Sequence, residues 1–271
     1  MVLLHSAGNT GAQWDALADH LDGEFSLFAP DLYDCGRTAK WTHPRAMSYD
    51  DHAALLAVWM LDHAPVHLVG HSFGGGVALR LAALHPDWLR SLTLIEPGAY
   101  QLLRDSGNEL PWLEFLRVLQ AFRSAVADGD LDRAWEVFFD SHCSHLPRWP
   151  DLPEPLRRTI RRRTPEQLRV YEAQESNPVR LEDIRRLACP TLVIRGQDSD
   201  EAERTLCALI ASLAPQGCLA DVPGARHMLA LTHAGDVARL LRSHLTPWSA
   251  LAPRPTATAL EPIVRAHWTA R

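Results

Sequence analysis

Ser72 is the residue whose type and setting most clearly indicate chemistry. It lies in the segment Gly-His-Ser-Phe-Gly, residues 70–74, directly after the apolar run 66–69 and directly before a run of small residues that begins with glycines. This order predicts a buried strand, a sharp turn and a helix. A serine in such a turn has strained backbone angles and presents its hydroxyl at the carboxyl edge of a sheet, within reach of a substrate. The strand and helix around Ser72 are therefore a stronger signal than the Gly-x-Ser-x-Gly pattern itself.

A base for this serine is found near the other end of the chain. Residues 219–222 are predicted to form a strand, and the turn Pro-Gly-Ala-Arg that follows it leads to His227. An imidazole at the same sheet edge can remove the proton of Ser72 as the hydroxyl attacks a carbonyl carbon, and can return it to the leaving group. The other histidines that follow or precede helices do not end a strand-to-loop transition facing Ser72. We interpret those as structural or surface residues: His71, His85, His233 and His244.

A glycine-rich loop near the start of the chain completes the set of candidate groups. It is His-Ser-Ala-Gly-Asn-Thr-Gly, residues 5–11, and it follows the short apolar run 2–4. Backbone N–H groups in a loop of this kind are free to face an anion. The loop could therefore supply part of an oxyanion hole.

Taken together, these ordered segments resemble the α/β-hydrolase family from Val2 to about Leu245. The resemblance implies a mostly parallel α/β sheet with helices on both faces, and a helical cap inserted after the strand that ends near Glu96. It also implies a serine hydrolase in which Ser72 is the nucleophile, His227 the base, and the N–H groups of Ala7 and Phe73 the oxyanion hole. The segments that carry the resemblance are 5–14, 30–38, 70–74, 92–97, 191–196 and 224–227.

The carboxylate that orients His227 is the point where the chain departs from the family pattern. The family usually has this acid three residues after the glycine that ends the strand following the cap, and that position is Ser199 here. Asp198 and Asp200 flank it, and a small loop adjustment would bring either into reach. Some branches of the family take the acid from the end of the strand after the nucleophile helix, which here is Glu96. We favour Glu96, with Asp198 second and Asp200 third.

The alternating pattern predicts an α/β-hydrolase core, a cap and a tail. Residues 1–97 and 188–246 form the predicted core, 98–187 the helical cap, and 247–271 a proline-rich C-terminal tail. The chain begins where the family usually has its third strand, so we expect the N-terminal edge hairpin to be missing. The predicted strand 25–29 would then be left unpaired and prone to association. Cap helices are predicted at 111–126, 131–139 and 155–171.

The cap is expected to select the substrate. Aromatic side chains recur in it at helical spacing, which is usually core packing, although some should line an apolar pocket above Ser72. The resulting prediction is hydrolysis of a small to medium, partly apolar carboxylic ester or related acyl compound. A thioesterase, a lactonase, a C–C bond hydrolase and a non-catalytic scaffold that binds a ligand or partner stay open as alternatives. The aromatic residues are Trp112, Phe115, Phe122, Trp135, Phe138, Phe139 and Trp149.

Composition restricts the partners. The 271 residues are 46% apolar and carry a formal charge of −6, which gives no reason to expect nucleic acid or an anionic membrane as a partner. No signal peptide or membrane-length apolar run is evident, so we expect a cytoplasmic protein that acts on a small molecule, and homo-oligomer formation stays open.

The segment His-Cys-Ser-His, residues 142–145, has too few clustered ligands for a metal site, and we expect neither metal nor cofactor. Five cysteines without paired spacing are expected to be free thiols.

Overall fold

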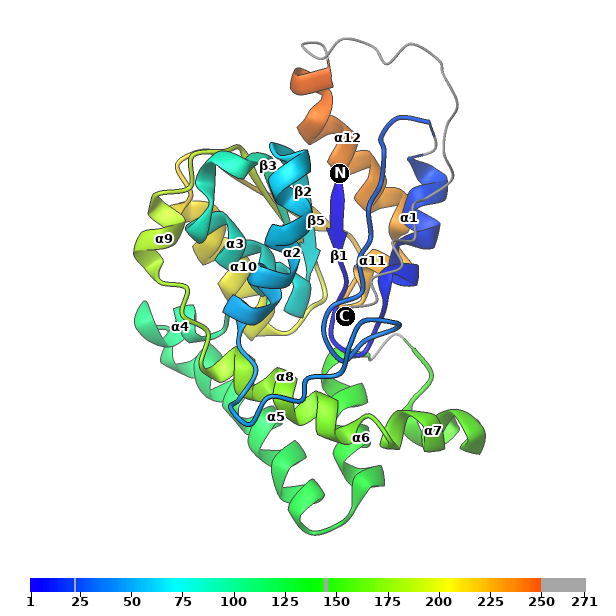
Figure 1. The fold of residues 1–271 in the computed structure, drawn as a ribbon. Helices are drawn as coiled ribbons and strands as arrows, with labels where there is room; N and C mark the ends of the chain where they lie inside the picture. Colours follow the sequence, from blue (N-terminus) through cyan, green and yellow to red (C-terminus); the bar gives the residue numbers. More distant parts are fainter. Residues whose placement is uncertain (22, 144–145, 250–271) are drawn as a thin grey trace.

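The computed structural model describes residues 1–21, 23–143 and 146–249, and it shows a parallel sheet with helices on both faces (Figure 1). The sheet has five strands in the order β1-β2-β3-β4-β5, and every neighbouring pair is parallel. The predicted fold class is therefore confirmed. The strands are β1 (Val2–Leu4), β2 (Val66–His71), β3 (Leu89–Ile95), β4 (Thr191–Gly196) and β5 (Gly217–Val222).

Alternation along the strands gives the sheet two buried faces. In β1, Leu3 belongs to one hydrophobic cluster while Leu4 belongs to another, and in β2 Val69 and Leu68 are divided in the same way. Side chains of successive strand residues point to opposite faces, so a strand that is apolar at consecutive positions must be covered on both sides. This explains why the central strands are nearly continuous apolar runs.

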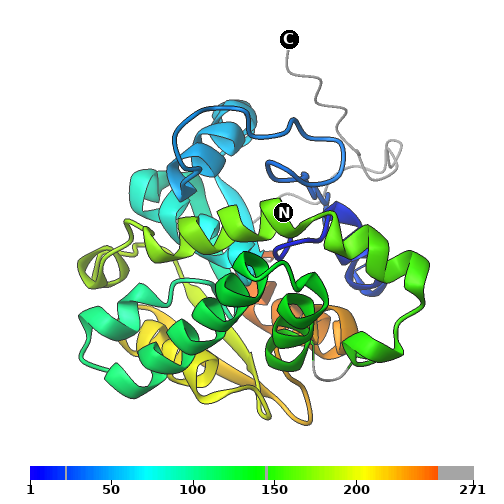
Figure 2. The same cartoon turned by 90° about the horizontal axis from the view of Figure 1, so that it is seen from below.

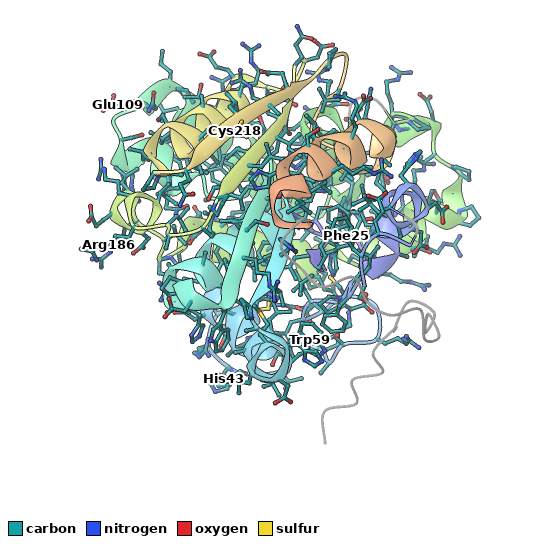
Figure 3. The ribbon with its side chains drawn as sticks, turned by 90° about the horizontal axis from the view of Figure 1, so that it is seen from above. Phe25, His43, Trp59, Glu109, Arg186 and Cys218 are labelled. Carbon is teal, nitrogen blue, oxygen red and sulfur yellow. The ribbon has the colours of Figure 1, made fainter. Side chains whose placement is uncertain are left out.

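Two layers of helices supply that cover. On one face lie α2 (Tyr49–His63), α3 (Phe73–Leu84) and α10 (Glu201–Leu213), and on the other lie α1 (Asp15–His20), α11 (Leu229–Thr232) and α12 (Ala234–Ser249). Figure 3 shows the same two layers from the end of the sheet at which β5 begins, next to the labelled Cys218. Ser48 forms a capping box with Asp51 at the start of α2.

Between β3 and β4 the chain is helical, and we refer to residues 101–185 as the insertion. It lies across the carboxyl ends of the strands, so that α5, α6 and α8 stand in front of the sheet in Figure 2. The expected single helix over 155–171 is two helices, because the chain breaks before Thr164-Pro165 and a new helix starts there. The helices are α4 (Gln101–Asp105), α5 (Glu109–Ala127), α6 (Leu131–His142), α7 (Glu154–Arg161), α8 (Thr164–Glu175) and α9 (Leu181–Arg185), with short 3-10 turns at Gly11–Trp14, Pro86–Trp88 and Trp149–Asp151.

One expectation about the edge of the sheet needs revision, and another concerns residues that the structure does not describe. The predicted strand 25–29 is reduced to one bridge, Val2 with Phe28, flanked by hydrogen bonds from Leu3 N to Phe28 O and from Phe28 N to Met1 O, both 2.9 Å. The ladder is short because β1 offers only three residues and Pro30, directly after the segment, has no N–H to donate. Of the predicted tail, residues 250–271 are outside the described residues, as are Ser144 and His145. No helix in the described part of the chain is long and apolar enough to cross a membrane.

Gly74, at the start of α3, allows the helix to approach the end of β1. A Cβ there would lie 2.4 Å from the carbonyl oxygen of Leu4 and 2.5 Å from that of His5. Because backbone cannot give way as a side chain can, we expect Gly74→Ala to lower the free energy of unfolding by about 1–3 kcal/mol. Urea denaturation measures this. Gly235→Ala is the matched control, since its Cβ would meet only the His20 ring, at 3.3 Å. Equal stability of the two variants would contradict the close approach.

Candidate active site

Ser72 lies in a tight turn between β2 and α3. Its backbone angles, φ 52° and ψ −119°, are in a region that side chains rarely adopt. Hydrogen bonds hold the turn: Ser72 N donates to Ile95 O at 2.9 Å, and Ser72 O accepts from Gly75 N at 2.8 Å and Gly98 N at 2.7 Å. A Cβ on Gly70 would lie 2.4 Å from Gly74 O. The turn is thus as sharp as predicted, and its glycines are required sterically.

Ser72, His227 and Glu96 form one hydrogen-bonded chain. The Oγ atom of Ser72 lies 2.9 Å from Nε2 of His227, and Nδ1 of His227 lies 2.8 Å from Oε2 of Glu96. The residues follow β2, β5 and β3, and since carboxyl ends of parallel strands meet at one edge of a sheet, three distant segments converge there. All three side chains are buried, with relative exposures of 6%, 4% and 1% for Ser72, His227 and Glu96.

Glu96 is held by two further donors. Its Oε1 atom accepts from Gly196 N at 2.7 Å and from Ser199 Oγ at 2.6 Å, which leaves Oε2 for His227. Its backbone φ of 40° is also in the left-handed region, which turns the side chain out of the line of β3. Ser199, which stands where the family usually has its acid, therefore donates a hydrogen bond to the carboxylate instead of supplying one.

The two aspartates that flank Ser199 lie elsewhere. Asp198 is exposed, and its backbone N–H donates to Ala225 O at 3.0 Å. Asp200 forms an ion pair with Arg226, at 2.9 Å between Oδ1 and Nη2. Within the described residues neither carboxylate is hydrogen-bonded to His227. The expectation that Asp198 serves as an alternative acid does not fit this geometry, because the turn after β4 directs Asp198 toward solvent.

The surroundings of His227 favour a base that is readily protonated during a reaction. Burial alone would lower the pKa of the imidazole, but the hydrogen bond to Glu96 and the charge of that carboxylate outweigh it, with smaller contributions from Glu203 and Asp200. The net pKa of His227 is therefore raised above its ordinary value. A nearby Glu203, buried and hydrogen-bonded to Tyr100 at 3.0 Å, has its pKa raised by burial to about 7.

Ala7 and Phe73, the residues predicted to donate N–H groups to an oxyanion, line the same cavity, and Phe73 directly follows Ser72 in the chain. We call this cavity the site cavity; its volume is about 30 Å³. Phe73 is the first residue of α3, so its N–H has no acceptor within the helix. The Ala7 N–H has no hydrogen-bond acceptor among the residues that the structure describes, whereas the N–H of Ser6 before it donates to Gln13 Oε1 at 3.0 Å.

The insertion closes the site cavity from above. Trp135 on α6 and Val170 on α8 line the cavity, and Arg163 donates a hydrogen bond to the carbonyl of Gly8 in the loop 5–11. Of the aromatic residues predicted in the cap, Trp135 lines the cavity, while Phe122 and Trp149 are buried within the insertion. The lining combines apolar side chains with a polar rim: Leu32, Met47, Phe73, Trp135, Val170, Arg163, Glu166 and Gln167.

Sequence reasoning missed His142 at the site. His142 ends α6, and its ring meets that of His227 edge to face, with 5.2 Å between ring centroids. Burial and the neighbouring His227 lower the pKa of His142 to about 3, so the ring is neutral. The sequence of residues 142–145 suggested only a metal site with too few ligands, because no local pattern indicates a contact with a loop 85 positions away. The contact is found only once the insertion is placed over the sheet.

Comparison with known proteins agrees with this arrangement. A sequence model described as "Alpha/beta hydrolase family" matches residues 1–240. The chain belongs to the alpha/beta hydrolase family. The same fold is seen in an esterase from Thermogutta terrifontis, with a TM-score of 0.64 and 23% identity over 91% of this chain and 89% of that one. It is also seen in the alpha/beta hydrolase MGS-M2 from a deep-sea metagenome, with a TM-score of 0.74 and 17% identity over 90% and 88%.

Curated relatives of this alpha/beta hydrolase match over shorter segments. Lipase LipV of Mycobacterium tuberculosis is 40% identical over 101 residues, which cover 36% of this chain and 37% of LipV. The pimeloyl-[acyl-carrier protein] methyl ester esterase of Aeromonas hydrophila is 30% identical over 175 residues, 64% of this chain and 65% of that protein. The chain thus matches little more than a third of the length of LipV and under two thirds of the esterase.

The dependence of His227 on Glu96 can be measured directly. In Glu96→Gln the carboxylate charge is lost while burial remains, so we expect the pKa of His227 to fall from above 6.5 to below it. Asp198→Asn is the control and should leave the pKa unchanged. NMR titration of the imidazole resonances measures both. A pKa that moves in Asp198→Asn but not in Glu96→Gln would show that the wrong carboxylate is assigned.

Proposed function

We propose that this protein is a serine hydrolase that cleaves a carboxylic ester with a short acyl group through an acyl-enzyme. The observation that carries the proposal is the unbroken series of contacts from Ser72 Oγ through the His227 ring to Glu96, at 2.9 Å and 2.8 Å. A hydroxyl, an imidazole and a carboxylate in this order are the groups that nucleophilic acyl transfer requires.

The first half of the reaction follows from these positions. His227 Nε2 removes the proton of Ser72 as Oγ attacks the ester carbonyl carbon, and the carbonyl oxygen becomes an oxyanion. The N–H groups of Ala7 and Phe73 would donate to that oxyanion, a contribution of roughly 3 kcal/mol per donor. Glu96 keeps Nδ1 protonated and stabilises the imidazolium. His227 then passes its proton to the leaving alcohol, the C–O bond breaks, and the acyl group stays on Ser72.

Water completes the cycle. His227 removes a proton from a water molecule as its oxygen attacks the acyl carbon, and the same proton returns to Ser72 Oγ when the acid product leaves. The same base thus serves both halves. His227 must be neutral to accept a proton. Because its pKa is raised, we expect activity to be lost, as the pH falls, at a pH above the ordinary pKa of an imidazole.

The size of the site cavity supports a short acyl group. Its volume is about 30 Å³, which is small beside the roughly 300–1,000 Å³ of pockets that hold drug-sized ligands. A short acyl group therefore suits the space beside Ala7 and Phe73 better than a long one. The apolar lining suits an alkyl chain. The names of two relatives, a lipase and a methyl ester esterase, also support ester hydrolysis.

Covalent labelling tests the proposed nucleophile. A fluorophosphonate probe should react with Ser72 of the wild-type protein, and Ser72→Ala should abolish both labelling and hydrolysis of p-nitrophenyl acetate. Glu96→Gln should lower turnover by about 10⁴-fold, because the imidazole loses its orientation and its counter-charge. Asp198→Asn is the matched control and should keep most of the activity. A folded wild-type protein that neither labels nor hydrolyses esters would instead favour a scaffold that binds a ligand or partner.

Trp135 should set the length of the acyl group. The indole is 4% exposed, lines the site cavity, and is fixed by a hydrogen bond from Nε1 to Thr164 Oγ1 at 3.0 Å. Trp135→Leu enlarges the cavity, so we expect the preference among p-nitrophenyl esters to move to longer acyl chains by at least about tenfold in relative kcat/KM. Phe122→Leu, a buried aromatic that does not line the cavity, is the control. If both variants showed the same shift in acyl-chain preference, its cause would be looser packing of the insertion and not the size of the Trp135 side chain.

A further inference from the structure

A second series of buried hydrogen bonds runs behind the reacting groups. Nε2 of His71 lies 2.8 Å from the backbone oxygen of His227, and Nδ1 of His71 lies 3.0 Å from Nε2 of Gln13. Oε1 of Gln13 accepts from the backbone N of Ser6 at 3.0 Å and from Ser6 Oγ at 2.7 Å. All of these residues are buried, with His71 at 0% and Gln13 at 4% relative exposure.

The direction of each hydrogen bond in this series is fixed by its chemistry. The carbonyl oxygen of His227 can only accept, so His71 must carry its proton on Nε2. Burial and the nearby His227 lower the pKa of His71 to about 3, so the ring is neutral and its Nδ1 can only accept. Gln13 must then turn its NH₂ toward His71 and its oxygen toward Ser6. A single orientation of every group satisfies the series.

The series joins two loops that the sheet leaves far apart. The loop that contains Ser6 and Ala7 follows β1, and the loop that contains His227 follows β5, at the opposite edge of the sheet. His71 is the last residue of β2 and directly precedes Ser72. The bonds from His71 therefore fix the backbone of His227 on one side and, through Gln13, the backbone of Ser6 on the other.

Fixing Ser6 has a direct effect on the oxyanion hole. Gln13 accepts from the N–H and the hydroxyl of Ser6, and the Ser6 carbonyl, which belongs to the same peptide as the Ala7 N–H, accepts from His5 Nδ1 at 2.8 Å. The peptides on both sides of Ser6 are therefore held, and neither rotates without breaking a buried hydrogen bond. Ala7 lines the site cavity, and its N–H is held in place as a consequence. A misplacement of about 1 Å in such a donor is enough to cost on the order of 100-fold in rate.

We propose that His71 and Gln13 are positioning residues that set the Ala7 N–H and the His227 imidazole relative to Ser72 as one unit. This proposal rests on the proposed hydrolase function. Under this proposal, replacing His71 lowers the reaction rate, whereas replacing an ordinary buried histidine would lower only the stability of the fold. In the described part of the chain neither side chain is hydrogen-bonded to the side chain of Ser72 or His227, although the His71 ring packs beside the His227 ring with 5.3 Å between centroids.

Kinetics of matched variants test whether His71 and Gln13 act together as positioning residues. His71→Leu and Gln13→Leu should each lower kcat on p-nitrophenyl acetate by roughly 10- to 100-fold with little change in KM, because the lost contacts matter in the transition state. The double variant should be no slower than the slower single one, since breaking the series once releases both loops. His71→Gln, which keeps one donor and one acceptor, should recover most of the loss. Labelling of Ser72 by the fluorophosphonate should slow in parallel.

His67→Leu is the matched control. His67 lies on the same strand, and its Nδ1 is 2.8 Å from Ser91 Oγ, away from the site, so its replacement should leave kcat unchanged while removing one histidine hydrogen bond. If His71→Leu does not fold, Gln13→Leu and His71→Gln carry the test. Wild-type kcat in the Leu variants, losses that multiply in the double variant, or no recovery in His71→Gln would overturn the proposal. An inactive, unlabelled wild-type protein would instead overturn the proposed function.

Discussion

A carboxylate buried without solvent is the constraint on which this site depends. The Glu96 side chain has no exposed surface, and a buried charge that lacks partners costs several kcal/mol. Three groups compensate it: the N–H of Gly196, the hydroxyl of Ser199 and the ring of His227. Because each comes from a different position on the β4 and β5 loops, satisfying one carboxylate fixes both loops. The position of His227, and hence its distance to Ser72, follows from that requirement.

The same edge of the sheet also carries backbone strain. Ser72 and Glu96 end adjacent strands and both have positive φ, at 52° and 40°. Each such conformation costs of order 1–3 kcal/mol and persists only where its surroundings determine it. Here the determining contacts are the hydrogen bonds of the Ser72 turn and the donors around Glu96. Strain and function coincide because a strand end must turn sharply to present a side chain over the edge of a sheet.

Local patterns were enough to predict some of these residues and not others. Ser72 and His227 each follow a strand and a turn that can be recognised within ten residues, so their types and places were predictable. Glu96 could only be ranked above Asp198, because the choice depends on which of two neighbouring loops turns inward. His142 and Gln13 were not predicted as site residues at all. Their contacts join the insertion or the first helical turn to loops more than 50 positions away, and no periodicity in the sequence encodes such a contact.

The place of the acid illustrates why sequence position alone does not fix its role. Strands β3 and β4 are in register, with Ile95 opposite Ile194, and Glu96 N donates to Ile194 O at 3.0 Å. The loops after the two strands therefore start side by side, and a carboxylate from either one begins at a similar distance from the His227 loop. When the acid stands on β3, the position on β4 needs only a donor, and Ser199 supplies one at 2.6 Å. The serine and the glutamate are thus complementary halves of one arrangement. A second carboxylate at 199 would face Glu96 across a buried gap, and the repulsion between the two would oppose the charge that His227 requires.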